Sequence, residues 1–141
     1  MRSVRSLVLG AVAAAALAAA PAANAATCVA GKDETALQTR VVQTELMVAA
    51  LSCNQTENYN SFVRMHQKEL MRAHERLRGL FRKVYGRSGG DKLNEFITRL
   101  ANESSQRSLS DVKAFCAGAE TMYAAALATD PKQLATFVSG Q

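Results

Sequence analysis

The sequence predicts an all-α protein, an antiparallel up-and-down four-helix bundle that ends in a short fifth helix. Two observations favour this fold class. Apolar residues recur at every third or fourth position over most of the chain, which is the spacing of one helix face. No stretch alternates apolar and polar residues between hairpin turns, as half-buried strands do. Short connections between the periodic stretches favour antiparallel neighbours.

Two amphipathic helices are expected first along the chain. The first opens at Thr35, which has the capping-box spacing to Gln38, and ends at Asn54 or Gln55. The residues expected on its inward face are Leu37, Val41, Val42, Leu46, Val48, Ala49 and Leu51. The second is one continuous helix over residues 56–85. Its apolar stripe consists of Tyr59, Phe62, Val63, Leu70, Ala73, Leu77, Leu80, Phe81 and Val84.

The third and fourth helices follow a glycine-rich turn. Asp91 is a good N-cap for the third helix, because its carboxylate can accept a hydrogen bond from the first turn. Ser104, Ser105 and Ser108 weaken the apolar pattern and suggest a break. Ser108 or Ser110 would then cap the fourth helix. Its expected inward residues are Val112, Phe115, Cys116, Ala119, Met122 and Ala126.

A short fifth helix is expected at the end of the chain. Asp130 stands at the N-cap position and Pro131 at the first helical position, and Gln133 follows three residues after the aspartate. This order is typical of a helix start. The apolar residues that would pack this helix are Leu134, Phe137 and Val138.

Residues 1–25 have the pattern of a secretory signal that is cleaved before Ala26. Two arginines precede an apolar run over residues 7–20, and Pro21 follows it. Small residues stand three and one positions before the expected cut. The run is shorter than the roughly 20 residues that a bilayer core requires, so we expect no membrane span. Residues 26–141 should then form a single periplasmic or secreted domain.

The three cysteines are Cys28, Cys53 and Cys116, and no two of them have Cys-x-x-Cys spacing. Disulfides persist in oxidising compartments outside the cytoplasm. In the expected bundle, Cys53 ends the first helix and Cys116 lies about one and a half turns into the fourth, at the same end. This geometry favours a Cys53–Cys116 disulfide. A Cys28–Cys53 pair and a fully reduced chain remain as alternatives.

Part of the sequence resembles a group of small exported helical proteins of Gram-negative bacteria. The segments that carry the resemblance are residues 37–53, Tyr59-Asn60-Ser61-Phe62 and Arg99-Leu100-Ala101-Asn102. No activity is known to us for this group. The resemblance therefore implies an exported helical domain, and it implies no catalytic residue, cofactor or ligand.

No catalytic constellation is visible in the sequence. Gly-x-Ser-x-Gly, His-Glu-x-x-His, phosphate-binding glycine loops and dinucleotide fingerprints are all missing. His66 falls near the middle of the apolar stripe and is expected in the core, and His74 falls at its edge and is expected at the surface. We therefore expect neither an enzyme nor a cofactor. The alternative function is a small metal or haem carrier, for which Met71 and His74, three residues apart, are weak candidate ligands.

Charge is the most informative feature. Residues 64–92 hold nine basic and three acidic residues, whereas the whole chain has a net charge of +5. The residues expected on the basic helix face are Arg64, Lys68, Arg72, Arg76, Arg82 and Lys83. This face predicts a binding or interaction role with an anionic envelope component, such as lipopolysaccharide, a lipid headgroup or an acidic protein. Exposed aromatic residues do not interleave the cations, which argues against nucleic acid. A merely solvated helix face is the alternative.

Overall fold

The computed structural model describes residues 29–141, and these residues form helices and short connections without any strand. The predicted all-α fold class is therefore confirmed. The α-helices are α1 (Lys32–Ser52), α2 (Thr56–Met65), α3 (Gln67–Tyr85), α4 (Gly89–Ser110), α5 (Val112–Ala128) and α6 (Leu134–Ser139). The 3-10 turns are η1 (Gly86–Ser88) and η2 (Pro131–Gln133). The expected signal, the cleavage site and Cys28 lie outside the described residues.

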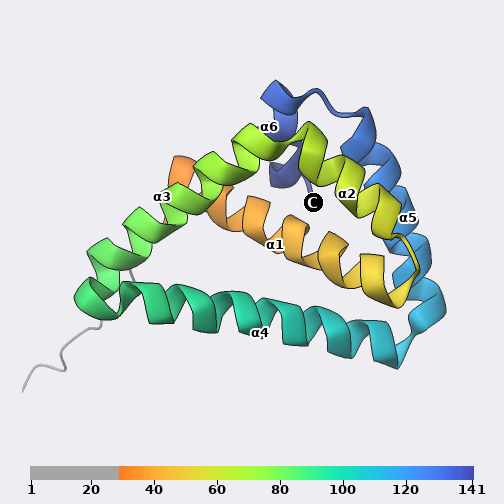
Figure 1. The fold of residues 1–141 in the computed structure, drawn as a ribbon, viewed down its shortest axis with the longest axis horizontal. Coiled ribbons are helices and arrows are strands. Elements are labelled where there is room, and N and C mark those ends of the chain that lie inside the picture. The colour runs from red at the N-terminus through yellow and green to blue at the C-terminus, as the bar shows by residue number, and fades with distance from the viewer. Residues whose placement is uncertain (1–28) are drawn as a thin grey trace, which may run out of the picture.

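Helix α1 is the central helix of the fold. Each of the other α-helices in residues 29–141 contacts it, and Figure 1 shows α1 enclosed by α2, α3, α4 and α5. Its buried residues are Ala36, Thr39, Val42, Thr44, Leu46, Val48, Ala49 and Ala50. The expectation of one inward face is wrong in part, since Val41 is 39% and Leu51 79% exposed. Neighbours pack on several sides of α1, so its buried positions do not follow one helical stripe.

Two clusters of apolar side chains meet along α1. The larger one joins α1 to α2, α5 and α6, and it is built around Leu46, Phe62 and Tyr123. The smaller one joins the start of α1 to α3 and α4 through Ala36, Leu77 and Leu93. Because α1 contributes to both clusters, it holds the two parts of the fold together.

The expected continuous helix over residues 56–85 is wrong, because it breaks at His66 into α2 and α3. His66 is fully buried, as predicted, and its Nε2 lies 3.0 Å from the carbonyl oxygen of Ala126. Ala126 is in the last turn of α5, where carbonyls lack a partner four residues ahead in the helix. The imidazole therefore donates to a carbonyl oxygen that otherwise accepts only a long 3.4 Å bond from the Thr129 N–H. The break lets α2 follow α5 while α3 runs along α1 and α4 (Figure 1).

Two predicted helix starts are also wrong. The first helix begins at Lys32, and Thr35 forms no capping box, because its hydroxyl donates to the Gly31 carbonyl at 3.2 Å. Helix α4 begins at Gly89, two residues before the predicted cap Asp91. A Cβ atom on Gly89 would lie 2.7 Å from the backbone nitrogen of Arg82. The absence of a side chain there lets α4 start directly against α3.

The break predicted around Ser104 and Ser108 does not occur, because α4 runs without interruption to Ser110. Both serines are buried, and the hydroxyl of Ser52 donates to that of Ser108 at 3.2 Å. These small serine side chains therefore let α4 pack closely against α1. The cap of α5 is Asp111, whose carboxylate accepts from the Ala114 N–H at 2.9 Å, and not Ser108 or Ser110.

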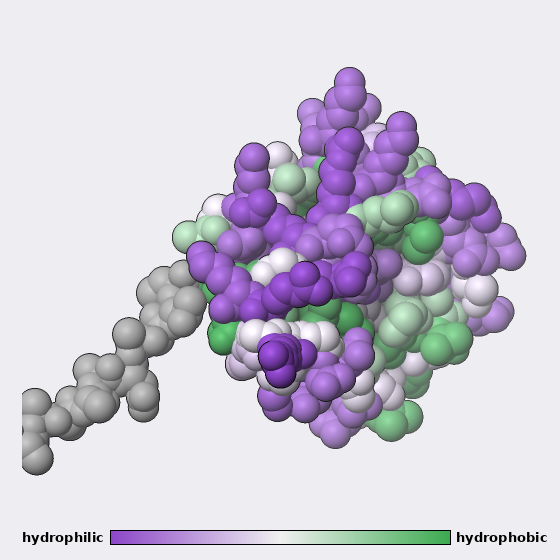
Figure 2. Space-filling view, turned by 60° about the vertical axis from the view of Figure 1, so that its left-hand side comes forward, coloured by the Kyte–Doolittle hydropathy of each residue, from purple (hydrophilic) through white to green (hydrophobic). Residues whose placement is uncertain are grey.

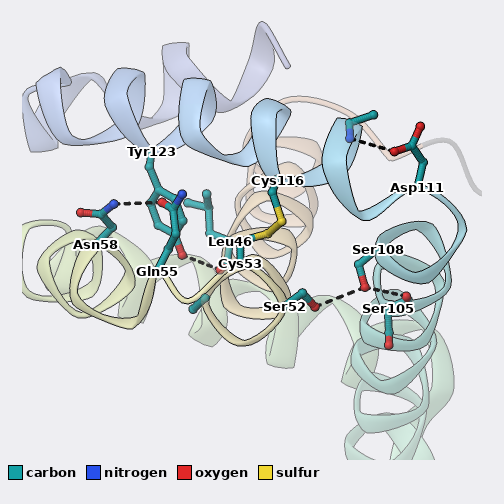
Figure 3. The surroundings of a disulfide bond; sticks show 12 residues. Leu46, Ser52, Cys53, Gln55, Asn58, Ser105, Ser108, Asp111, Cys116 and Tyr123 are labelled. Carbon is teal, nitrogen blue, oxygen red and sulfur yellow. Dashed lines mark hydrogen bonds between the residues drawn. A yellow bond between two sulfur atoms is a disulfide. The ribbon is translucent and has the colours of Figure 1, made fainter.

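The predicted disulfide between Cys53 and Cys116 is confirmed, with their Cα atoms 5.5 Å apart. Figure 3 shows it between α1 and α5, beside Tyr123, whose hydroxyl donates to the Leu46 carbonyl. The last predicted cap is also confirmed, because the carboxylate of Asp130 accepts from the Lys132 N–H at 2.8 Å. No helix in the described part of the chain combines the length and the apolar character required to cross a bilayer.

The contact between α3 and the start of α4 predicts that alanine substitutions at two adjacent glycines change the stability of the protein by different amounts. Gly89→Ala should lower the free energy of unfolding by roughly 1–3 kcal/mol, because the added methyl group collides with the α3 backbone. Gly90→Ala is the matched control, since a Cβ there meets nothing within 4 Å. Urea unfolding of both variants measures the difference. Equal stability of the two would contradict the close approach.

The disulfide should contribute strongly to stability. Cys53→Ser opens a link between residues that are 63 positions apart, and loop-closure entropy alone gives a loss of about 4 kcal/mol under oxidising conditions. Thermal unfolding with and without reductant measures it. Reductant should lower the melting temperature of the parent and leave that of Cys53→Ser almost unchanged.

Candidate functional site

Helix α3 separates apolar and basic residues on opposite faces. Leu70 and Leu77 are buried against the core. The six predicted basic-face residues are all exposed: Arg64, Lys68, Arg72, Arg76, Arg82 and Lys83. Figure 2 shows the molecule with the α3–α4 turn brought forward, and most of that surface is hydrophilic. Five of these side chains are exposed on α3, and Arg64 is exposed on α2.

Two members of this face are engaged by carboxylates. Nη1 of Arg72 lies 3.3 Å from Glu69 Oε1 on the same helix. Nε of Arg76 lies 2.6 Å from Oδ1 of Asp33, which belongs to α1. Exposed pairs of this kind contribute little to stability, but they cancel local positive charge. The middle of α3 is therefore a weaker anion site than the sequence indicated.

Three arginines lie close together at the end of α3. Arg78, Arg82 and Arg87 line a surface cleft of about 780 Å³. Its other lining residues are Glu75, Gly79, Gly86 and Gly90. Glu75 pairs with Arg78, with Oε1 and Nη1 3.1 Å apart. Within residues 29–141, neither Arg82 nor Arg87 forms an ion pair.

The backbone of the turn shapes this arginine cleft. Helix α3 ends at Tyr85, and its C-cap is Gly86, whose φ of 60° lies in the left-handed region that glycine adopts most easily. The single turn η1 carries Arg87, and α4 then begins beside the cleft. Among the described side chains none caps α4, because the Ser88 hydroxyl donates back to the Tyr85 carbonyl at 2.9 Å. The Gly89 N–H bonds to the Gly86 carbonyl, and the positive end of the α4 helix dipole lies near Gly90.

Sequence reasoning missed Arg78 and Arg87 as members of the site. Arg87 lies beyond the end of α3, so helical periodicity alone does not place it. Arg78 is four residues before Arg82, and this i, i+4 spacing beside a glycine-rich turn is the signal that indicates a shared cleft.

His74 was expected at the surface, but it is partly buried against α1. Nη2 of Arg40 lies 2.9 Å from Nδ1 of His74. Arginine always carries its protons, so it donates and Nδ1 accepts. Burial first, and the Arg40 charge second, lower the pKa of His74, and burial also lowers the pKa of Arg40. The structure thus holds His74 in its neutral form.

The same contact bears on the candidate metal ligands. The Arg40 guanidinium occupies Nδ1 of His74 and places a positive charge beside it, while Met71 points to solvent with 61% exposure. Groups of three or more His, Cys, Asp or Glu side chains suited to a metal do not occur in the described residues. The surroundings of His74 therefore do not favour a bound cation at Nδ1.

Comparison with protein-family models, curated proteins and solved structures finds no match for this chain. The resemblance to exported helical proteins therefore stays a prediction. Any functional conclusion rests on the geometry and charge of the chain itself.

The Arg40 contact predicts an unusual titration of His74. Its pKa should lie below the ordinary value of 6.5, and Arg40→Met should raise it by removing a repulsive charge. Because the unfolded chain binds the proton more readily, the free energy of unfolding should fall as the pH drops from 6.5 towards the lowered pKa. NMR titration of the two histidine Cε1–H signals measures the shift. A His74 pKa above 6.5 in the parent would contradict the contact.

Proposed function

We propose that the protein is a non-enzymatic exported helical protein that binds an anionic component of the bacterial envelope. The arginine cleft, lined by Arg78, Arg82 and Arg87, carries this proposal because two of its three guanidinium groups lack a carboxylate partner in residues 29–141. The exposed basic face of α3 continues from it and extends the positive surface.

The chemistry of the cleft fits phosphate groups. Guanidinium groups bind phosphate oxygens through two parallel hydrogen bonds, which a lysine ammonium cannot do. The first turn of α4 lies on the same side and adds the positive end of its helix dipole. Phosphorylated headgroups and lipopolysaccharide carry the matching negative charge.

Export is part of the same proposal. It is supported by the signal-like pattern of residues 1–25 and by the Cys53–Cys116 disulfide, since such bonds persist in oxidising compartments. We interpret the fold as a modified up-and-down four-helix arrangement, in which α2 and α3 together fill the second position and α6 is the short fifth helix.

Charge reversal in the cleft should weaken anion binding. Arg82→Glu combined with Arg87→Glu should weaken binding to phosphatidylglycerol vesicles or to lipopolysaccharide by at least about tenfold. The folded structure should remain, because both side chains are exposed. Vesicle co-sedimentation and circular dichroism measure the two properties. Binding by the parent should also decrease with salt, because the screening length shortens from about 10 Å at 0.1 M to about 3 Å at 1 M.

Arg99→Glu combined with Lys113→Glu is the matched control, since it makes the same change in charge away from the cleft. Arg99 lies on α4 among Asp91, Glu95 and Glu103, where the surface is acidic. This control should bind almost as the parent does. An equal loss of binding in both double variants would show that only net charge matters. A parent protein that binds neither vesicles nor lipopolysaccharide would refute the proposal.

A further inference from the structure

An apolar groove lies on the other side of the same end of α3. It has a volume of about 350 Å³ and is lined by Val29, Leu37, Leu80, Phe81, Val84 and Tyr85. Val84 is 45% and Tyr85 48% exposed, although both residues adjoin the apolar side of the amphipathic helix α3. These two side chains are therefore not needed for the core.

Aromatic packing holds Tyr85 in place. The rings of Phe81 and Tyr85 have their centroids 5.7 Å apart, and Phe81 makes the same 5.7 Å contact with Phe96 of α4. The row connects the exposed tyrosine to the smaller core cluster. Packing against Phe81 therefore holds the exposed ring of Tyr85 in place.

The groove and the arginine cleft are the two sides of one protruding turn. At 100° per residue, Arg78 and Arg82 project from one side of α3, and Phe81 and Val84 project from another. Lys83 directly precedes Val84 in the sequence and Arg87 follows Tyr85 by two residues, and both cations are exposed. Aromatic and aliphatic side chains flanked by Lys and Arg are characteristic of segments that enter the interface of an anionic bilayer.

We infer that the α3–α4 turn docks on the surface of an anionic phospholipid bilayer, with Val84 and Tyr85 inserted among the lipids and the arginine cleft on the headgroup phosphates. This inference rests on the proposed anion binding and names its partner. Charge complementarity selects the bilayer, because the exposed apolar residues and the arginine cleft lie at the same end of α3, on neighbouring sides of one turn. A soluble anion would use the cleft and leave the groove exposed to water.

Tryptophan fluorescence tests the insertion directly, because the chain has no Trp. Tyr85→Trp places one fluorophore in the groove. Leu51→Trp is the matched control at the far end of α1, where Leu51 is 79% exposed. With phosphatidylglycerol vesicles whose acyl chains are brominated, emission from Trp at position 85 should shift to the blue and be quenched. Emission from position 51 should stay unchanged.

A second pair of measurements separates insertion from charge. Val84→Ser combined with Tyr85→Ser should weaken vesicle binding by at least about tenfold and leave binding of soluble polyphosphate unchanged. The Arg82→Glu, Arg87→Glu variant should lose binding to vesicles and to polyphosphate.

The two proposals fail in different ways. Vesicle binding without quenching at position 85, or polyphosphate binding without vesicle binding, would overturn the insertion and keep the anion-binding function. Emission from position 85 could also be blue-shifted before vesicles are added and stay unchanged afterwards. This result would mean that other parts of the chain fill the groove, and it would overturn the insertion as well. Absence of binding to vesicles, lipopolysaccharide and polyphosphate would overturn both.

Discussion

Burial of α1 among the other helices is the constraint on which the structure depends. Helices far apart along the chain all contact α1, and both apolar clusters include its side chains. Small residues such as Ala36, Ala49 and Ala50 allow this enclosure, because a larger side chain at these buried positions would hold the neighbours apart. The disulfide at Cys53 and the hydrogen bond from Tyr123 then tie α5 to the end of α1.

The same enclosure decides where the candidate site lies. Since α2 must follow α5 while α3 follows α4, the chain bends at His66, where the imidazole bonds to the end of α5. Helix α3 then extends beyond the larger cluster, and Gly89 lets α4 return in direct contact with it. The resulting turn protrudes, and it carries arginines on one side and apolar residues on the other.

Electrostatic pairing selects which cations remain available. Carboxylates on α1 and α3 engage Arg72, Arg76 and Arg78, whereas Arg82 and Arg87 have no such partner in the described chain. Sequence counting treats all these side chains alike. Their capacity to bind an anion differs because carboxylates lie near Arg72, Arg76 and Arg78 and pair with them, whereas none pairs with Arg82 or Arg87 in the described chain.

The sequence by itself determined the helical class, the cap at Asp130 and the disulfide. Each depends on local spacing or on the expected order of helices along the chain. Tertiary structure alone decided the break at His66, whose partner Ala126 is 60 residues away, and the start of α4 at Gly89 against the α3 backbone. It also decided the membership of Arg87 in the cleft. These features depend on contacts between distant segments, and such contacts leave no periodic pattern in the sequence because a single residue on each segment is enough to make them.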